Sequence, residues 1–169
     1  LFLGRGGTNR EDRQPVNEVR RYSMGLGKIS KIFIYEKKGA APISCDACEL
    51  TVEDGIKGDW HGSDLQRQIS ILPVEVRDFQ EEGFCLKKFK ENVQVEGIDF
   101  SKTSPGTFLR MGEVVLQITE VFKKCYPELC ELAKSGQDCS LRRQAVFAKV
   151  ARGGWLRTGD DVKINTGQK

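Results

Sequence analysis

The chain has 169 residues, of which 38% are hydrophobic and 30% are charged, a balance typical of one globular domain with a real core. The sequence holds no apolar run of about 18 residues, the length that spans a bilayer, so we expect no membrane contact. No basic and then apolar leader is visible, and the six cysteines therefore predict free thiols in the cytoplasm rather than a disulfide scaffold. The formal net charge of +3 is too mild to indicate a nucleic-acid partner.

The first residues differ in composition from the rest of the chain. Residues 1–23 contain glycines and a proline and show little apolar periodicity. Their arginines are Arg5, Arg10, Arg13, Arg20 and Arg21. Such a stretch is either a basic arm for RNA or an acidic partner, or a flexible or artificially added extension. We favour the extension, since the segment lacks the interleaved aromatic residues on which bases stack. The predicted organisation is an extension over residues 1–26 and one domain over residues 27–166.

Short strands dominate the predicted elements. Residues 28–35 are rich in β-branched and aromatic side chains and end at a polar turn. Residues 49–53 form a weaker strand candidate, and residues 68–72 form a stronger one that Pro73 closes. Residues 73–82 carry apolar side chains at irregular helical spacing, which predicts a short helix with the proline in its first turn.

The second half of the chain continues this pattern. Residues 92–96 alternate apolar and polar side chains, and residues 114–121 form the longest predicted strand. A short helix is predicted at residues 127–135, and strands at 145–150 and 161–164 complete the set. Because strands and helices do not alternate regularly, we predict a mainly β fold: a closed or partly open β-barrel with a few short peripheral helices.

A polar, glycine-rich segment precedes the strand predicted at residues 68–72. It contains Gly58, Asp59 and the only histidine, His61, and Arg67 follows it. Glycines allow the close backbone approach that a phosphate site needs, and an arginine can pair with a phosphate through two hydrogen bonds. The alternative is a turn whose aspartates and glycines satisfy only local geometry. One histidine without partners makes no metal site.

Asn92 stands at the start of the following predicted strand. Its amide both donates and accepts hydrogen bonds, which suits the polar edge of a pterin or a phosphate. The alternative is a polar residue that caps a turn.

A cluster of thiols follows the longest predicted strand. Cys125 comes directly after Lys123 and Lys124, whose positive charges favour a thiolate. A thiolate is a soft metal ligand and a strong nucleophile, so Cys125 can hold a metal or a sulfur atom. Cys130 and Cys139 are secondary ligands, resolving thiols or, in the simplest alternative, gap-filling residues under a loop.

These segments, in this order, resemble the MOSC family, the domain named for the C-terminal part of molybdenum cofactor sulfurases, and in particular its small stand-alone bacterial members. The pattern Gly-x-x-Gly-Asp-x-His and then Arg-Gln-x-Ser is met by Gly55, Gly58, Asp59, His61, Arg67, Gln68 and Ser70. The pattern Glu-Asn-x-x-x-Glu-Gly is met by Glu91, Asn92, Glu96 and Gly97. The closing cysteine, Phe-Ala and glycine elements are met by Cys125, Cys130, Gly136, Cys139, Phe147, Gly153, Gly154, Gly159 and Asp160.

The resemblance implies a mostly β barrel with peripheral helices and the handling of the molybdenum cofactor (molybdopterin), or of sulfur destined for metal centres. It implies that Cys125 either ligates molybdenum or carries sulfur as a persulfide. The residues that we expect to hold the cofactor are Gly58, Asp59, His61, Arg67 and Asn92. The chain departs from the family at Tyr126, where members often have a histidine.

Three functions remain open under this resemblance. Some relatives with a bound cofactor reduce N-hydroxylated compounds, but a reductase of this kind would need an electron-transfer partner, since the chain has no flavin, haem or iron–sulfur motif. A sulfur transferase would need a sulfur donor or acceptor protein, because the chain has no pyridoxal-phosphate domain that could release sulfur. A non-catalytic module would store the cofactor or insert it into another protein. Separately, Cys45 and Cys48 offer half of a zinc site, but no second pair at matching spacing follows.

Overall fold

The computed structural model describes residues 26–79, 84–121, 126–136 and 139–165. Within these ranges the strands are β1 (Leu26–Ile34), β2 (Ile43–Cys45), β3 (Ala47–Thr51), β4 (Gly55–Ile56), β5 (Ile69–Pro73), β6 (Val93–Glu96), β7 (Phe108–Met111), β8 (Val114–Val121), β9 (Val146–Arg152), β10 (Gly154–Arg157) and β11 (Asp161–Asn165). The helices are η1 (Trp60–Ser63), α2 (Val74–Phe79), α3 (Phe84–Lys88), η2 (Pro127–Leu129), α4 (Glu131–Lys134) and α5 (Ser140–Gln144).

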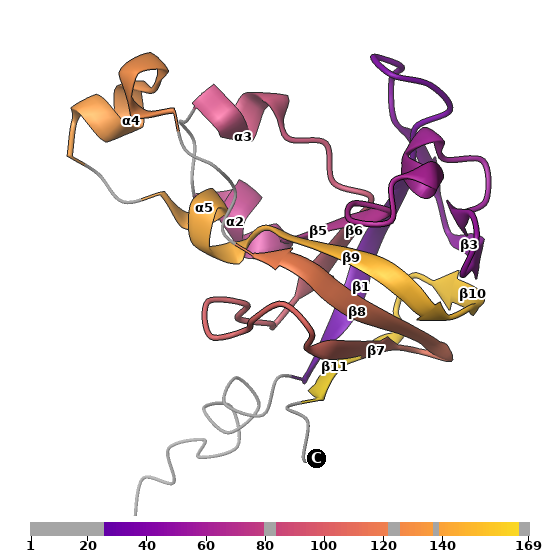
Figure 1. The fold of residues 1–169 in the computed structure, drawn as a ribbon. Coiled ribbons are helices and arrows are strands. Elements are labelled where there is room, and N and C mark those ends of the chain that lie inside the picture. Colours follow the sequence, from indigo (N-terminus) through magenta and orange to yellow (C-terminus); the bar gives the residue numbers. More distant parts are fainter. Residues whose placement is uncertain (1–25, 80–83, 122–125, 137–138, 166–169) are drawn as a thin grey trace, which may run out of the picture.

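Seven strands close into a barrel. They pair in the order β11-β7-β8-β9-β5-β6-β1, and antiparallel pairing of β1 with β11 completes the ring (Figure 1). β2 extends the sheet beyond β1, while β10, β3 and β4 form a separate small sheet. This architecture confirms the predicted mainly β fold with a barrel and a few short helices.

Alternating side chains explain why the barrel wall forms. In β8, Val114, Leu116 and Ile118 are buried, and their neighbours along the strand are more exposed. These apolar side chains join those of the other six barrel strands in one core cluster inside the ring. At about 25 cal/mol per Å² of buried apolar surface, this cluster provides the main stabilisation of the fold.

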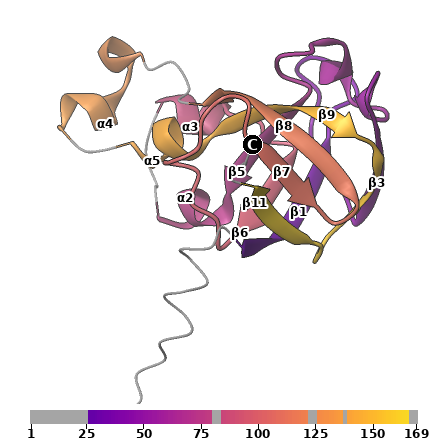
Figure 2. The ribbon, with the colours of Figure 1, turned by 60° about the horizontal axis from the view of Figure 1, so that its bottom comes forward.

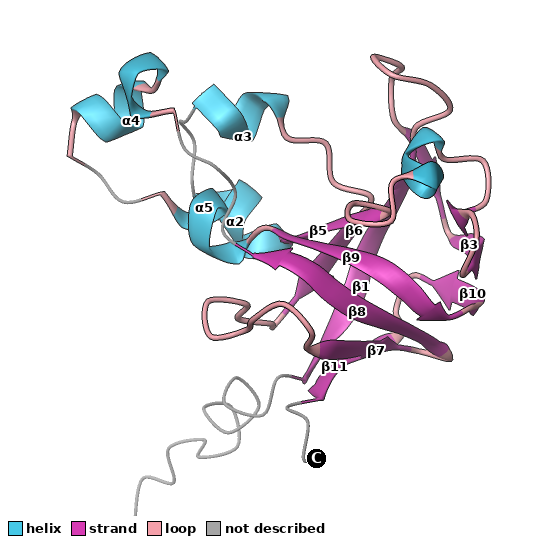
Figure 3. Ribbon diagram, in the orientation of Figure 1, coloured by secondary structure: helices cyan, strands magenta, loops and turns pink. Residues whose placement is uncertain are grey.

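A second apolar cluster lies against the outside of the barrel. It joins Leu72 of β5 and Phe147 of β9 to Val76, Leu86 and Leu141, which belong to α2, α3 and α5. These helices and α4 therefore gather on one side, as the ribbon coloured by secondary structure and the rotated view show (Figures 2 and 3). The barrel thus has an inner core and one outer face that is partly covered by helices.

Several elements differ from the sequence-based predictions. β7 and β10 were not predicted. Each has only four residues; β7 pairs with the neighbouring β8 and with the distant β11, and β10 pairs with the distant β3. The helix predicted at residues 127–135 is split into η2 and α4, since Cys130 between them has an extended backbone (φ −114°, ψ 117°). Residues 1–25 and Cys125 lie outside the described residues. No helix in the described part is long and apolar enough to cross a membrane.

Candidate functional site

The glycine-rich segment forms a tight loop between β4 and β5. Gly58 has a φ of +89°, a backbone conformation that residues with a side chain rarely adopt. Asp59 follows it and caps η1, because its carboxylate accepts a hydrogen bond from the backbone N–H of His61 at 2.9 Å. A Cβ at Gly62 would collide with the backbone carbonyl of Asp54, so the loop closes on itself only with glycine at this position.

The Asp59 carboxylate is the centre of a buried hydrogen-bond network. Its side chain has no exposed surface and accepts hydrogen bonds from four donors. Oδ1 receives the N–H of His61 at 2.9 Å and lies 2.7 Å from His61 Nδ1. Oδ2 receives the backbone N–H of Tyr35 at 2.9 Å and Nδ2 of Asn92 at 2.8 Å. Burial acts to raise the pKa of Asp59, but these hydrogen bonds outweigh it and the pKa is lowered, so the carboxylate is charged at neutral pH.

Asn92 is fully buried, and its amide is bonded on both sides. Nδ2 donates to Asp59 Oδ2 and to the carbonyl of Phe33, at 2.8 and 3.2 Å. Oδ1 accepts from the backbone N–H and the hydroxyl of Ser70, each at 3.1 Å. Both Nδ2 hydrogens are therefore used, whereas Oδ1 shares the single hydroxyl hydrogen of Ser70 with the carbonyl of Lys90. Asn92 thus joins β5, β6 and the Asp59 loop, and contact of Nδ2 with a ligand would require one of its bonds to break.

His61 presents one nitrogen away from the network. Because Nδ1 is held by a carboxylate, the proton of a neutral imidazole is expected on Nδ1, which leaves the lone pair on Nε2. The ring stacks on Trp60, with centroids 4.0 Å apart, and meets Tyr35 edge-on at 6.3 Å. A quarter of the side chain is exposed. The structure thus fixes the orientation of the imidazole while leaving it accessible to a ligand or a proton.

Arg67 belongs to the loop before β5, and its side chain lies beside the C-terminal end of β8. Its Nε and Nη2 donate to the carboxylate of Glu120 at 2.9–3.2 Å, and its guanidinium lies 4.7 Å from the centre of the Phe147 ring. The hydrogen bonds that Arg67 donates to Glu120 raise the pKa of Arg67, and the charges of Glu120 and Asp64 add to the rise. Glu120 is the last residue but one of β8 and lies five residues before Cys125 in the chain. Arg67 therefore lies near the start of the predicted thiol segment.

The network of Asp59, His61 and Asn92 is connected to Arg67 along the outer face of the barrel. Ser70, which binds Asn92, is the direct cross-strand partner of Phe147, over which Arg67 lies. Directly opposed residues of an antiparallel pair place their side chains on the same face. A chain of contacts thus links Arg67, through Phe147 and Ser70, to Asn92, and Asn92 is linked to His61 through Asp59. Cys125 lies outside the described residues, and its approach to this face stays a prediction.

Two further motif residues serve the framework. Gln68 is fully buried; its Nε2 donates to the carbonyls of Gly62 and Val52 at 3.1 Å, and its Oε1 accepts the N–H of Val150 at 2.9 Å. Glu91 is also buried and binds Arg77, with its shortest contact at 2.7 Å. Burial acts to raise the pKa of Glu91, but the bonds from Arg77 and Gln94 lower it. These residues hold the loops in place and need no ligand to explain them.

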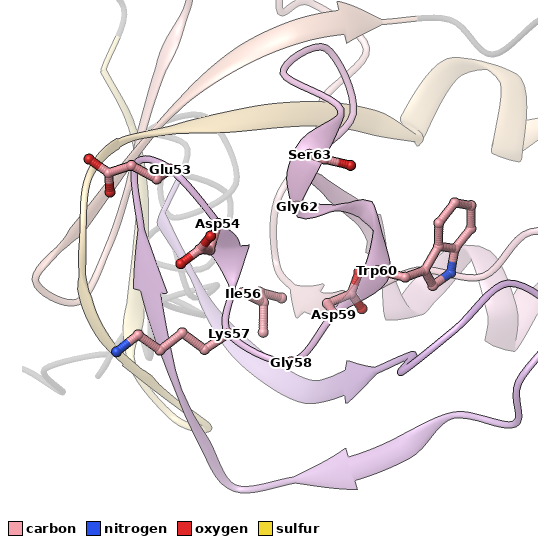
Figure 4. Close-up of a pocket in the computed structure, with 9 residues that line it drawn as sticks. All are labelled: Glu53, Asp54, Ile56, Lys57, Gly58, Asp59, Trp60, Gly62 and Ser63. Atoms are coloured by element: carbon pink, nitrogen blue, oxygen red, sulfur yellow. The ribbon is translucent and has the colours of Figure 1, made fainter.

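A pocket lies beside the same loop. Its volume is about 380 Å³, and Figure 4 shows Asp59 and Trp60 at the opposite end from Glu53 and Lys57. Its lining residues are Glu53, Asp54, Ile56, Lys57, Gly58, Asp59, Trp60, Gly62 and Ser63. Carboxylates prevail among them, and the one lysine is bound to Glu49 at 2.8 Å. The pocket is therefore a poor fit for the phosphate that the glycine-rich segment was predicted to bind.

Sequence reasoning missed Glu120 and Tyr35 as parts of this site. Tyr35 contributes its backbone N–H to Asp59 and its ring to His61, and its hydroxyl donates to the carbonyl of Glu91 at 3.2 Å. Neither residue belongs to a local motif. Their roles depend on strand pairings that no short pattern encodes.

The chain is similar to known proteins in sequence pattern and in fold. The family model of the MOSC domain matches residues 57–163, more than half of the chain. The curated proteins contain no match.

Similar solved structures support the fold assignment. The YuaD protein from Bacillus subtilis has 20% identity and a TM-score of 0.62, over 85% of this chain and 97% of that chain. YiiM from Escherichia coli has 19% identity and a TM-score of 0.51, over 84% of this chain and 71% of that chain. At such identities the likeness shows a common fold.

Proposed function

The chain belongs to the MOSC domain family, which is associated with molybdenum cofactor sulfurase-like proteins, and from this premise we propose that it binds the molybdenum cofactor. In this proposal Cys125 ligates molybdenum or carries sulfur for metal–sulfur centres, beside the face that His61 and Arg67 form. When bound, the cofactor supplies a redox-active molybdenum centre.

The position of Arg67 carries the proposal. Arg67 lies against Glu120 at the end of β8, the strand that leads towards Cys125. Guanidinium groups bind phosphates through two parallel hydrogen bonds, so Arg67 has the chemistry for the cofactor phosphate. Glu120 now occupies that fork, and phosphate would have to replace it. This exchange is feasible because both side chains are partly exposed, at 52% and 36%.

His61 has the second suitable group. With Nδ1 fixed by Asp59, Nε2 can accept a hydrogen bond from a ligand or take up a proton. Asp59 and Asn92 act on the ligand only through His61 and the loop, because their own polar atoms are bonded to protein. Gly58 contributes the backbone turn that places Asp59. The predicted cofactor-binding set thus separates into two contact residues, His61 and Arg67, and three positioning residues.

Two alternatives follow from the same cysteine. As a persulfide carrier, the chain would pass sulfur from a donor protein to an acceptor protein. As a storage or insertion module, it would hold the cofactor without turnover. Reduction of N-hydroxylated compounds would additionally need an electron-transfer partner.

Native mass spectrometry of the full chain, purified from a host that makes the cofactor, tests the proposal. We expect an adduct of pterin size that contains molybdenum. A sulfur-sized adduct that a thiol reductant removes would favour the persulfide carrier instead. Elemental analysis for molybdenum and labile sulfur quantifies either species.

Cys125→Ser is the decisive variant. We expect it to lose the adduct, because the oxygen of a neutral serine is a poor substitute for a thiolate toward a soft centre. Cys45→Ser and Cys48→Ser are matched controls and should keep it. Undiminished molybdenum and labile sulfur in Cys125→Ser would contradict the assignment.

A further inference from the structure

Cys45 and Cys48 lie on the same side of the chain at the corner between the two sheets. In a continuous strand, residues three apart point to opposite faces. Here a bend at Asp46 separates β2, in the barrel sheet, from β3, in the small sheet. The carbonyl of Asp46 accepts the N–H of Thr158 at 2.9 Å, which anchors the bend. As a result, both cysteines pack against the same apolar core cluster, and their side chains are close enough for each to act on the pKa of the other.

The two thiols differ in accessibility. Cys48 is 5% exposed, whereas Cys45 is partly exposed and its Sγ also lies 3.9 Å from the carbonyl of Ile32. A solution reagent therefore reaches Cys45 first. Cys48 lies deeper in the protein than Cys45, where it could act as the resolving thiol.

We propose that Cys45 and Cys48 form a reversible disulfide by exchange with a low-molecular-weight disulfide, a reaction separate from the predicted chemistry of Cys125. Both cysteines are free in the structure. The bond would fasten the corner at which β2 leaves the barrel sheet and β3 enters the small sheet. A zinc site does not account for this pair, because the described residues contain no third or fourth metal ligand beside it.

The exchange balances in two steps. The Cys45 thiolate attacks one sulfur of the reagent disulfide; a protein–reagent S–S bond forms, and the first reagent thiolate leaves. Cys48 then loses its proton and attacks Sγ of Cys45, which releases the second reagent thiolate. The two protein thiols lose two electrons and two protons, and the reagent disulfide gains them as two thiols.

The surroundings predict slow exchange and a persistent product. Burial raises the pKa of Cys48 to about 12, and the neighbouring Cys45 and Asp59 add to the rise. Burial, followed by the charge of Asp46, also raises the pKa of Cys45. Although Cys48 acts to lower the pKa of Cys45, the pKa of both thiols is raised overall, in contrast to strongly oxidising Cys-x-x-Cys motifs, whose low thiol pKa favours the reduced form. The pair is therefore suited to a slowly formed, persistent structural disulfide and not to rapid redox turnover.

The test treats the folded full chain with oxidised glutathione, then unfolds it in denaturant, blocks remaining thiols by alkylation and maps tryptic peptides without reduction. The peptide of residues 39–57 contains Cys45 and Cys48 and no other cysteine. We expect this peptide to lose about 2 Da, the two thiol hydrogens, and to resist alkylation until a thiol reductant is added.

Single variants test the order of the two steps. Cys48→Ser should stop at a glutathionyl group on Cys45, because the resolving thiol is missing. Cys45→Ser should leave Cys48 as a thiol, because Cys48 is buried. Cys85→Ser, which leaves the pair intact, should behave as the original chain.

Two results would overturn the proposal. One is alkylation of both cysteines in the original chain after prolonged exposure to oxidised glutathione, a measurement that needs no variant. The other is a linkage of Cys45 or Cys48 to any other cysteine.

Discussion

Replacement of Asp59 by asparagine separates the framework role of this residue from its effect on His61. The carboxylate accepts four hydrogen bonds, whereas an amide has one accepting oxygen and one donating nitrogen. If the amide nitrogen faced Tyr35 and Asn92, two donors would lose their acceptor. If it faces His61, the ring can move its proton to Nε2 and accept through Nδ1, so that only the backbone N–H of His61 loses its partner. We expect the second arrangement.

The magnitude follows from that single lost bond. A hydrogen bond to a charged group contributes about 1.5–3 kcal/mol. We therefore expect Asp59→Asn to lower the free energy of unfolding by about 2 kcal/mol, or Tm by about 4–8 °C for a chain of this size. Asp59→Ala is the matched control. It removes the acceptor of all four donors and should cost more than about 4 kcal/mol.

The change also has a spectroscopic signature. His61 is the only histidine in the chain, so its imidazole nitrogens give unambiguous ¹⁵N NMR signals. For the neutral imidazole we expect the ring proton on Nδ1 in the original chain and on Nε2 in Asp59→Asn. A lone pair on Nε2 is then lost, and any function that needs Nε2 as an acceptor should fall with it.

Acid provides a second check. The pKa of Asp59 is lowered on folding from its ordinary value of 3.8, so its contribution to stability is present above that pH and is lost as the pH falls through the folded pKa. Asparagine has no such dependence. The difference in Tm between the two chains should therefore shrink below pH 3.8. A ring proton that stays on Nδ1, together with a Tm within about 1 °C of the original, would refute this account of Asp59.

Three other predictions concern separate parts of the chain. Deletion of residues 1–23 should cost under about 1 kcal/mol and move Tm by no more than a few degrees, because the segment has too few apolar side chains to repay its ordering; a much larger drop in calorimetry would show that it packs on the barrel. Glu120→Gln removes the ion-pair partner of Arg67. We expect it to tighten the binding of inorganic pyrophosphate about two- to five-fold in titration calorimetry, which corresponds to the free energy of an exposed ion pair. Unchanged affinity would mean that Arg67 binds no anion. Gly62→Ala forces a Cβ against the carbonyl of Asp54 and should lower the free energy of unfolding by about 2–3 kcal/mol in urea, and a neutral result would show that the loop can open at no cost.

The sequence by itself determined the principal barrel strands. Residues 114–121 alternate buried and more exposed side chains, and β8 has those bounds. Residues 28–35 are rich in β-branched and aromatic side chains and predict β1, which the structure places at Leu26–Ile34. Such segments can be recognised because their composition or alternation is a property of the strand itself. β7 and β10 have only four residues each, and their pairings with β11 and β3 join segments that are far apart in the chain.

The candidate site divides in the same way. The order of its motifs can be read from the chain, and the choice of Gly58, Asp59, His61, Arg67 and Asn92 as cofactor-binding residues stays a prediction. The sequence does not show which of these side chains form their hydrogen bonds with the protein itself. Asp59 and Asn92 lie 33 positions apart, yet each satisfies the other in the folded chain.

Only the tertiary structure decided that Asp59 and Asn92 bond to protein, while only Nδ1 of the His61 ring is held by Asp59. It also decided that Glu120 occupies the fork of Arg67. The physical reason is that a buried polar group must find its hydrogen-bond partners among whatever folds against it. A residue type fixes how many hydrogen bonds a side chain can make, but the strands that pack around it fix with whom it makes them.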